Sequence, residues 1–309
     1  MLKINRLSIF FIKITISIIF LYHLFLNNKI EINSILFFYN NIFEFILLLL
    51  FLFVFLYVPI IIRWKLLLSV LNIKICFLKL VKIGLIAQFV TVLIAGSLGA
   101  DAVKTFYLIK ESNNLQNNKY NIIFCTIFDK IIGLVSLLLL CLFAFLSNYI
   151  NVFILFIIIC VTFFLIFYIF FIINNLFKVI LYIINNNNGF IAKFKIFINY
   201  YKDKYFILTS AFFISFFVQI NLSLLIYFIT NSVVGVKISI YDFFIISPLA
   251  ELSSIIPISP FGIGIGHFSY QTIFELFGQS GGANVFNSLL FLKISFSLLG
   301  LLPFLINKK

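Results

Sequence analysis

The chain has few of the residues from which catalytic sites are normally built. It holds two histidines, His23 and His267, far apart in the sequence, and nine acidic residues in 309 positions. It contains no His/Cys cluster, no Gly-x-Ser-x-Gly motif and no Asp-x-Asp pair. Metal and nucleophilic catalysis therefore lack their usual residues, and we predict no enzyme activity, no cofactor and no metal centre. The cysteines have no Cys-x-x-Cys spacing and are interpreted as small apolar core residues: Cys76, Cys125, Cys141 and Cys160.

Charged side chains are also scarce, and this excludes a soluble globular protein. They make up 10% of the chain, against 64% hydrophobic residues, and the mean hydropathy is +1.23. A run of about 20 apolar residues is long enough to cross a bilayer. We predict one all-α transmembrane domain over 1–309, a polytopic integral membrane protein with six spanning helices: 7–26, 42–62, 121–146, 150–173, 206–230 and 284–306.

The net charge of +13 comes largely from lysines and arginines in short segments between the apolar runs. Basic loops stay in the cytoplasm and contact anionic headgroups, so this distribution reports orientation in a membrane rather than nucleic-acid binding. The basic clusters at 63–82 and in the loop 174–205 are placed in the cytoplasm, with the loop along the membrane interface. The protein is predicted to lie in the inner membrane, with both chain termini in the cytoplasm.

Two further apolar segments are interrupted where an intact membrane helix would be expected. The first, 76–111, is broken near Gly96 and Gly99, and the second, 240–278, is broken by a proline and glycine run at 257–267. Counting crossings by the charge rule leaves neither segment free to cross the membrane completely. We therefore predict two re-entrant broken-helix hairpins that enter from opposite faces.

Span, hairpin and span follow one another in both halves of the chain, over 42–146 and over 206–306. The two units are similar in length and opposite in predicted orientation. This is the pattern of an inverted repeat, in which broken helices line a site for a substrate that crosses the bilayer. Residue-by-residue similarity between the units is not evident, so the repeat is inferred from charge alone.

The second break offers a chemical reason for such a site. Irregular backbone at membrane depth must line protein or a water-filled cavity. Two prolines remove donors and three glycines permit tight turns, at Pro257, Pro260, Gly262, Gly264 and Gly266. A helix restarting at His267 would offer its amino end to a phosphate or carboxylate. The alternatives are that the glycines serve close helix packing and that His267 is a buried structural imidazole.

Charged residues inside apolar segments are the second group of candidates. Asp129 and Lys130 lie within the third span, where a charge costs on the order of 3 kcal/mol. They either line a polar path or are structural, in which case Asp129 pairs with Lys104 or Arg63 and Lys130 reaches toward the headgroups.

The remaining candidates lie beside these segments. Asp101 is expected to cap the helix that carries Lys104. Glu251, in an apolar stretch before the second break, is expected to line a polar path. Arg63 and Trp64 are predicted to anchor the second span at the headgroup interface, with phosphate contact as the alternative.

Four motifs resemble the transmembrane region of lysylphosphatidylglycerol synthases. They are the runs 63–68, 96–104, 128–134 and 257–267, which occur in the family's order over nearly the whole chain. Stand-alone versions of this region are known as flippase-like membrane proteins, which implies movement of a lipid between leaflets. The family's soluble aminoacyltransferase domain is missing from this sequence, so lysine transfer is not expected. Lys104 and Lys130 stand where the family usually has arginine, which keeps the charge but not bidentate phosphate geometry.

These features together predict a lipid flippase or transporter for an anionic phospholipid or a lipid-linked sugar. Membrane lipids, and a separate lipid-modifying enzyme, are the expected partners. Two alternatives stay open: a membrane transferase acting on a phospholipid or polyprenyl-phosphate, and a scaffold without a substrate. The predicted substrate path comprises Asp101, Lys104, Asp129, Lys130, Glu251, Pro257, Pro260, Gly262, Gly264, Gly266 and His267.

Overall fold

The computed structural model describes residues 33–94, 97–111, 119–147, 190–254 and 262–306, together with Tyr22 and Lys29. Every regular element in these segments is helical, which confirms the all-α prediction. The predicted spans 7–26, apart from Tyr22, and 150–173 lie outside the described residues. So do Pro257 and Pro260.

Four helical segments are long and apolar enough to cross a membrane, and each coincides with a predicted span. They are Ile42–Val70, Lys119–Leu142, Tyr205–Val233 and Gly282–Ile306. The first consists of α3 (Ile42–Phe51), the π-helical turn η1 (Leu52–Tyr57) and α4 (Val58–Val70). The others are α7 (Lys119–Ser147), α10 (Tyr205–Phe228) with the π-helical turn η2 (Ile229–Val233), and α13 (Gly282–Leu298) with α14 (Leu301–Ile306). The short helix α2 (Asn33–Asn40) precedes α3.

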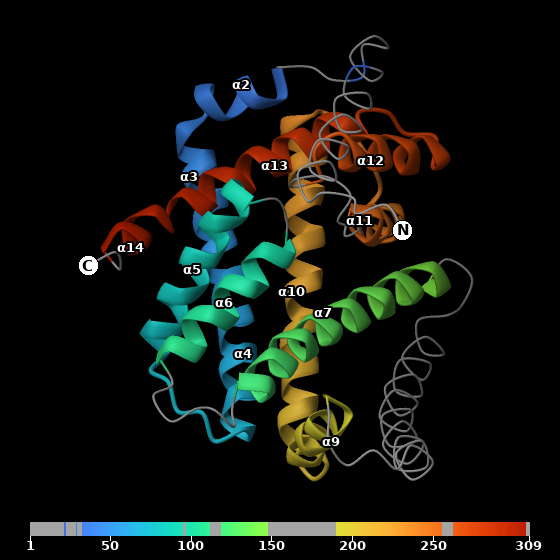
Figure 1. Cartoon of the computed structure of the whole chain (residues 1–309). Helices are drawn as coiled ribbons and strands as arrows, with labels where there is room; N and C mark the ends of the chain where they lie inside the picture. Colours follow the sequence, from blue (N-terminus) through green and yellow to red (C-terminus); the bar gives the residue numbers. More distant parts are fainter. Residues whose placement is uncertain are drawn as a thin grey trace, which may run out of the picture.

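Two of these segments form an antiparallel pair at the centre of the molecule. Helix α4 and the turn η1 pack on α10, and the two segments run in opposite directions (Figure 1). The helix α9 (Phe190–Tyr201) joins this pair at one end, where the Tyr201 hydroxyl donates to the Leu67 carbonyl at 2.9 Å. The end of α4 and the start of α10 therefore lie at the same end of the bundle. The described lysines in the links that follow α4 and precede α10, Lys74, Lys202 and Lys204, flank this end.

The first interrupted segment folds as a helical hairpin. Its arms are α5 (Phe77–Ile94) and α6 (Ser97–Glu111), which lie side by side (Figure 1). Lys79 and Glu111 form an ion pair of 2.9 Å between the open ends of the arms. Asp101 is the fifth residue of α6, so the prediction that it caps this helix is wrong. Glycine is tolerated within the first helical turn, and the helix therefore starts before Gly99 rather than after it.

The second interrupted segment has the same form. Its arms are α11 (Ile240–Ser254) and α12 (Ile265–Leu276), so the predicted helix restart after the glycine run is confirmed. Gly262 and Gly264 have φ angles of +73° and +83°, which other residues rarely adopt. Gly266 has a different role, because a Cβ at this position would clash with the ring of Phe286 on α13. Two glycines thus turn the chain and the third permits close helix packing.

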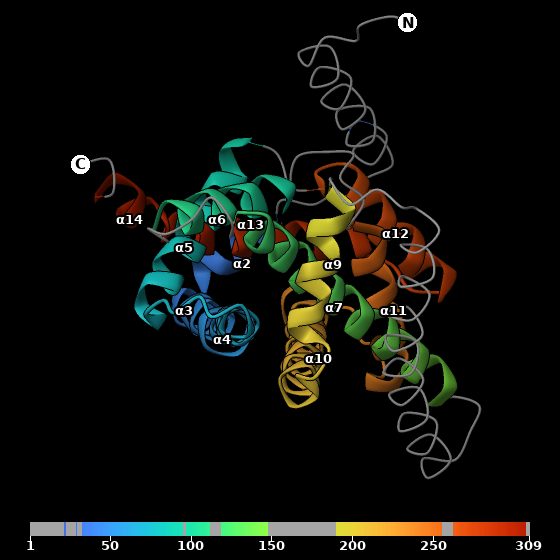
Figure 2. The same ribbon diagram turned by 60° about the horizontal axis from the view of Figure 1, so that its bottom comes forward.

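The two hairpins are held apart by two strongly tilted helices, α7 and α13 (Figures 1 and 2). Helix α7 packs on α6 of its own half and on α11 of the other half. Helix α13 packs on α12 of its own half and on α5 of the other half. The described parts of the hairpins form no extensive interface with each other. Each of these two helices therefore connects the two halves of the chain, and the inverted-repeat units 42–146 and 206–306 stay a prediction.

Candidate functional site

Asp129 on α7 is bound by Arg63 in the interior of the bundle. Arg63 Nε donates to Asp129 Oδ1 at 2.7 Å, and Arg63 Nη1 donates to Ser215 Oγ on α10 at 2.6 Å. The two charged side chains are only 7% and 11% exposed. This is the pairing with Arg63 that the sequence left as one of two alternatives. Arg63 and its neighbour Trp64 are buried, which differs from their predicted place at the headgroup interface.

The groups around this ion pair lock three helices together. Ser215 Oγ lies 2.8 Å from Ser136 Oγ on α7, and Gln219 Nε2 donates to the Gly133 carbonyl at 3.4 Å. Gly133 faces the Arg63 guanidinium, since a Cβ there would lie 3.5 Å from Nη1. Because the charges are paired and buried between α4, α7 and α10, this cluster acts as a structural clamp.

Lys130, the next residue on α7, faces the first hairpin instead. Its Nζ donates to Asp101 Oδ2 on α6 at 2.7 Å. Successive residues of an α-helix point about 100° apart, so one helix presents Asp129 to the bundle interior and Lys130 to the hairpin. The side chains of Lys130 and Asp101 are 33% and 28% exposed. Unlike the clamp, this pair can be reached from outside the protein.

Lys104 lies near the same pair. It follows Asp101 by three residues on α6, which places both on one face of the helix. Its Nζ lies 5.8 Å from the centre of the Trp64 ring, within range of a cation–π interaction. Trp64 is 2% exposed, and its Nε1 has no hydrogen-bond partner among the described residues. We refer to Asp101, Lys104 and Lys130 as the first-half site.

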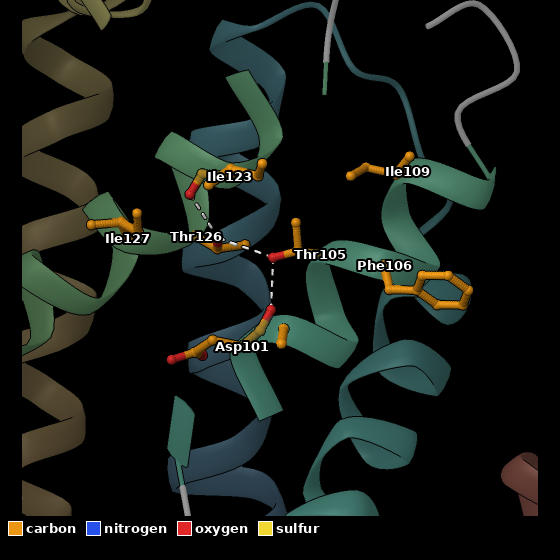
Figure 3. A pocket seen from close by; sticks show the side chains of 8 residues that line it. Asp101, Thr105, Phe106, Ile109, Ile123, Thr126 and Ile127 are labelled. Carbon is orange, nitrogen blue, oxygen red and sulfur yellow. Dashed lines mark hydrogen bonds between the residues drawn. The ribbon is translucent and has the colours of Figure 1, made fainter. Parts of the chain in front are cut away.

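An open groove of about 420 Å³ runs between α6 and α7 beside this site. Asp101 lies at one end and Ile109 at the other (Figure 3). The Thr105 and Thr126 hydroxyls lie 3.2 Å apart, and each also donates to a carbonyl of its own helix. The remaining lining is apolar: Ala102, Phe106, Ile109, Ile123 and Ile127. The groove is therefore an apolar trough with a charged end, a shape that suits an amphiphile.

The second half contains a comparable lysine–carboxylate pair. Glu251 Oε1 on α11 accepts a hydrogen bond of 2.7 Å from the Tyr270 hydroxyl and one of 3.2 Å from Lys293 Nζ. Sequence analysis singled out Glu251 but missed both partners. Lys293 is a lone charge within a predicted span, the same signal that identified Lys130. We refer to Glu251, Tyr270 and Lys293 as the second-half site.

His267 has a structural role at the start of α12. Its side chain is buried, and the Gly264 N–H donates to Nδ1 at 3.3 Å. The imidazole also packs edge-on against Phe286, with ring centres 4.7 Å apart. An Nδ1 that accepts a hydrogen bond carries no proton, so the ring satisfies a free backbone donor at the helix start. The geometry favours the structural alternative for His267 over a cation facing an anion.

The model of one family, the lysylphosphatidylglycerol synthase TM region, matches residues 10–302. The chain belongs to this family. No curated protein and no solved structure matches it. Membership, together with the four apolar helices, identifies a membrane protein with a lipid-related function.

In this member of the lysylphosphatidylglycerol synthase TM family, the predicted charged residues fall into three places. Asp129 belongs to the clamp. Asp101, Lys104 and Lys130 form the partly exposed first-half site, and Glu251 is buried in the second-half site. Among the described residues, no three His, Cys, Asp or Glu side chains lie close enough to hold a metal ion.

Proposed function

We propose that the protein moves an anionic lipid between the leaflets of the cytoplasmic membrane. The headgroup is received at the first-half site, and an acyl chain lies along the apolar groove between α6 and α7. One observation supports this above the others: Asp101, which forms a partly exposed ion pair with Lys130, also lines one end of an apolar groove.

The charge of the first-half site matches a headgroup with one phosphodiester. Lys104 and Lys130 supply two positive charges and Asp101 one negative charge, so one positive charge is in excess. Asp129 does not alter this balance, because Arg63 neutralises it. A phosphate can compete with the Asp101 carboxylate for the Lys130 ammonium, which binds as a point charge and changes partners without a fixed geometry.

The pair also explains how the site stays stable when it is empty. An unpaired charge at membrane depth is costly, and Asp101 offsets the charge of Lys130 until a headgroup arrives. The acyl chains do not need to leave an apolar environment, because the groove is open at its side toward the surrounding lipid. Only the headgroup requires a polar route.

The direct test is lipid translocation in proteoliposomes. Fluorescent phosphatidylglycerol is followed by dithionite quenching, with Lys130→Gln and Lys104→Gln compared with the unmodified protein. Loss of one charge-assisted hydrogen bond, roughly 1.5–3 kcal/mol, predicts a rate at least about ten-fold lower in each variant. Lys79→Gln is the matched control, since Lys79 also pairs with a carboxylate on the same hairpin but is 60% exposed and lies at the open end of the hairpin, where it pairs with Glu111 rather than Asp101.

Three results would contradict the proposal in different ways. Unchanged rates in both Lys130→Gln and Lys104→Gln would remove the first-half site from the mechanism. A change in the mass of the lipid after incubation with a donor would identify a transferase. No translocation by the unmodified protein, with no anionic lipid retained on purification, would indicate a scaffold.

A further inference from the structure

We infer that the second-half site is a second binding site for the same anionic headgroup, with Lys293 as the group that contacts the phosphate. The inference rests on the proposed function and extends it from one headgroup site to two. It assigns a role to Lys293 and Tyr270, which the sequence motifs did not include.

The two sites combine the same kinds of element in the two halves, with Asp101 on the second arm of its hairpin and Glu251 on the first arm. Lys130 lies on α7 and Lys293 lies on α13. Each of these helices follows the hairpin of its own half. Each lysine pairs with a carboxylate on that hairpin, Lys130 with Asp101 and Lys293 with Glu251.

The second-half site also combines a fixed carboxylate with an accessible ammonium. The Glu251 side chain is 11% exposed, and the fully buried Tyr270 holds it in place. The Lys293 side chain is 38% exposed, close to the 33% of Lys130. A purely structural pair would have both members buried, as in the Arg63–Asp129 clamp. Here the cation is the member that a headgroup can reach.

The two sites lie toward opposite ends of the bundle. Helix α7 begins beside the end of α4, whereas α13 begins at the other end of α10 and packs on η2 (Figure 1). A headgroup that crosses the membrane therefore meets one lysine–carboxylate site toward each end of the bundle.

Counting bound lipids by native mass spectrometry tests this inference. The unmodified protein is purified in a neutral detergent and mixed with phosphatidylglycerol, with phosphatidylcholine as the zwitterionic control lipid. We expect it to retain two phosphatidylglycerol molecules at collision energies that strip phosphatidylcholine. Lys293→Gln and Lys130→Gln should each retain one, and the double variant should retain none.

Further variants separate loss of binding from loss of folding. Lys293→Gln leaves the Glu251 carboxylate buried without its cation, so Glu251→Gln/Lys293→Gln removes both charges and should again retain one lipid. Lys293→Arg should retain two. If both variants that lack Lys293 retain two molecules while Lys130→Gln retains one, the second site does not exist but the proposed function stands. If Lys130→Gln also retains two, the headgroup chemistry of both proposals fails.

Discussion

Asp129 and Lys130 are adjacent in the sequence, yet they belong to ion pairs with different surroundings. Asp129 is bound by Arg63 between α4, α7 and α10, whereas Lys130 is bound by Asp101 at the partly exposed face of the first hairpin. Both residues lie on one turn of α7. The buried Asp129–Arg63 pair therefore fixes the part of the helix that carries the accessible Lys130 ammonium. This relationship separates the residues that hold the bundle together from those available to a substrate.

Removal of one partner of the clamp should destabilise the protein strongly. Asp129→Ala leaves the buried Arg63 guanidinium without a counter-charge, and such a loss costs about 3–5 kcal/mol. The free energy of unfolding in mixed detergent–SDS micelles measures the effect. Arg63→Met/Asp129→Leu removes both charges and should recover most of the lost stability. Equal losses in the single and double variants would show that the pair does not act as a unit.

The packing role of Gly266 gives a second prediction. Gly266→Ala places a methyl group against the Phe286 ring, and overpacking of this kind costs about 1–3 kcal/mol. Gly133→Ala is the matched control, because its added carbon would make only ordinary contacts of 3.5 Å and 3.9 Å with the Arg63 guanidinium. Thermal unfolding in detergent should show a lower midpoint for Gly266→Ala alone. A similar decrease in both variants would point to a general intolerance of substituted glycines.

Hydropathy and charge predict much of this fold because both are patterns of consecutive residues and can be seen in the sequence. Apolar length alone predicts the spans 42–62 and 206–230, which lie within Ile42–Val70 and Tyr205–Val233. The glycine run predicts a helix restart at His267, two residues after α12 begins. The sequence also identifies Asp101, Lys130 and Glu251 as charges that require an explanation. What it does not specify is the partner of each charge. Partners such as Ser215 and Tyr270 are brought in by helix packing between distant segments.

Two differences between the sequence prediction and the structure have clear physical causes. Arg63 and Trp64 resemble interface anchors in sequence, but α10 and α7 cover this part of α4 and bury both side chains. Lys293 was overlooked although it is the only charge in its apolar segment, whereas Lys130 stands beside Asp129. Because a charge within the membrane requires a partner, a carboxylate partner could have been predicted for Lys293. Only the fold shows that this carboxylate is Glu251.

The role of His267 can be tested by exchanging its charge and its acceptor separately. His267→Asn keeps a side-chain acceptor for the Gly264 N–H, whereas His267→Lys keeps only a cation. If the residue caps α12, His267→Lys should lose about 1–2 kcal/mol of stability and His267→Asn less. Unfolding midpoints and phosphatidylglycerol translocation are measured on the same preparations. Full activity of His267→Lys with loss of activity in His267→Asn would instead indicate contact with an anion.

The groove itself can be blocked without changing a charge. Ile127 lines the trough between α6 and α7 and is 50% exposed, so Ile127→Trp should fill space that the proposed acyl chain occupies. Ile131 lies one turn further along α7, is 47% exposed and does not line the groove, which makes Ile131→Trp a control of equal size and hydrophobicity. Because both positions are about half exposed, neither substitution should lower stability by more than about 0.5 kcal/mol, the usual range for surface changes. We expect translocation of fluorescent phosphatidylglycerol to fall several-fold in Ile127→Trp and to be unchanged in Ile131→Trp. Equal rates in the two variants would show that the lipid chain does not use this groove, even if the headgroup binds at Lys130.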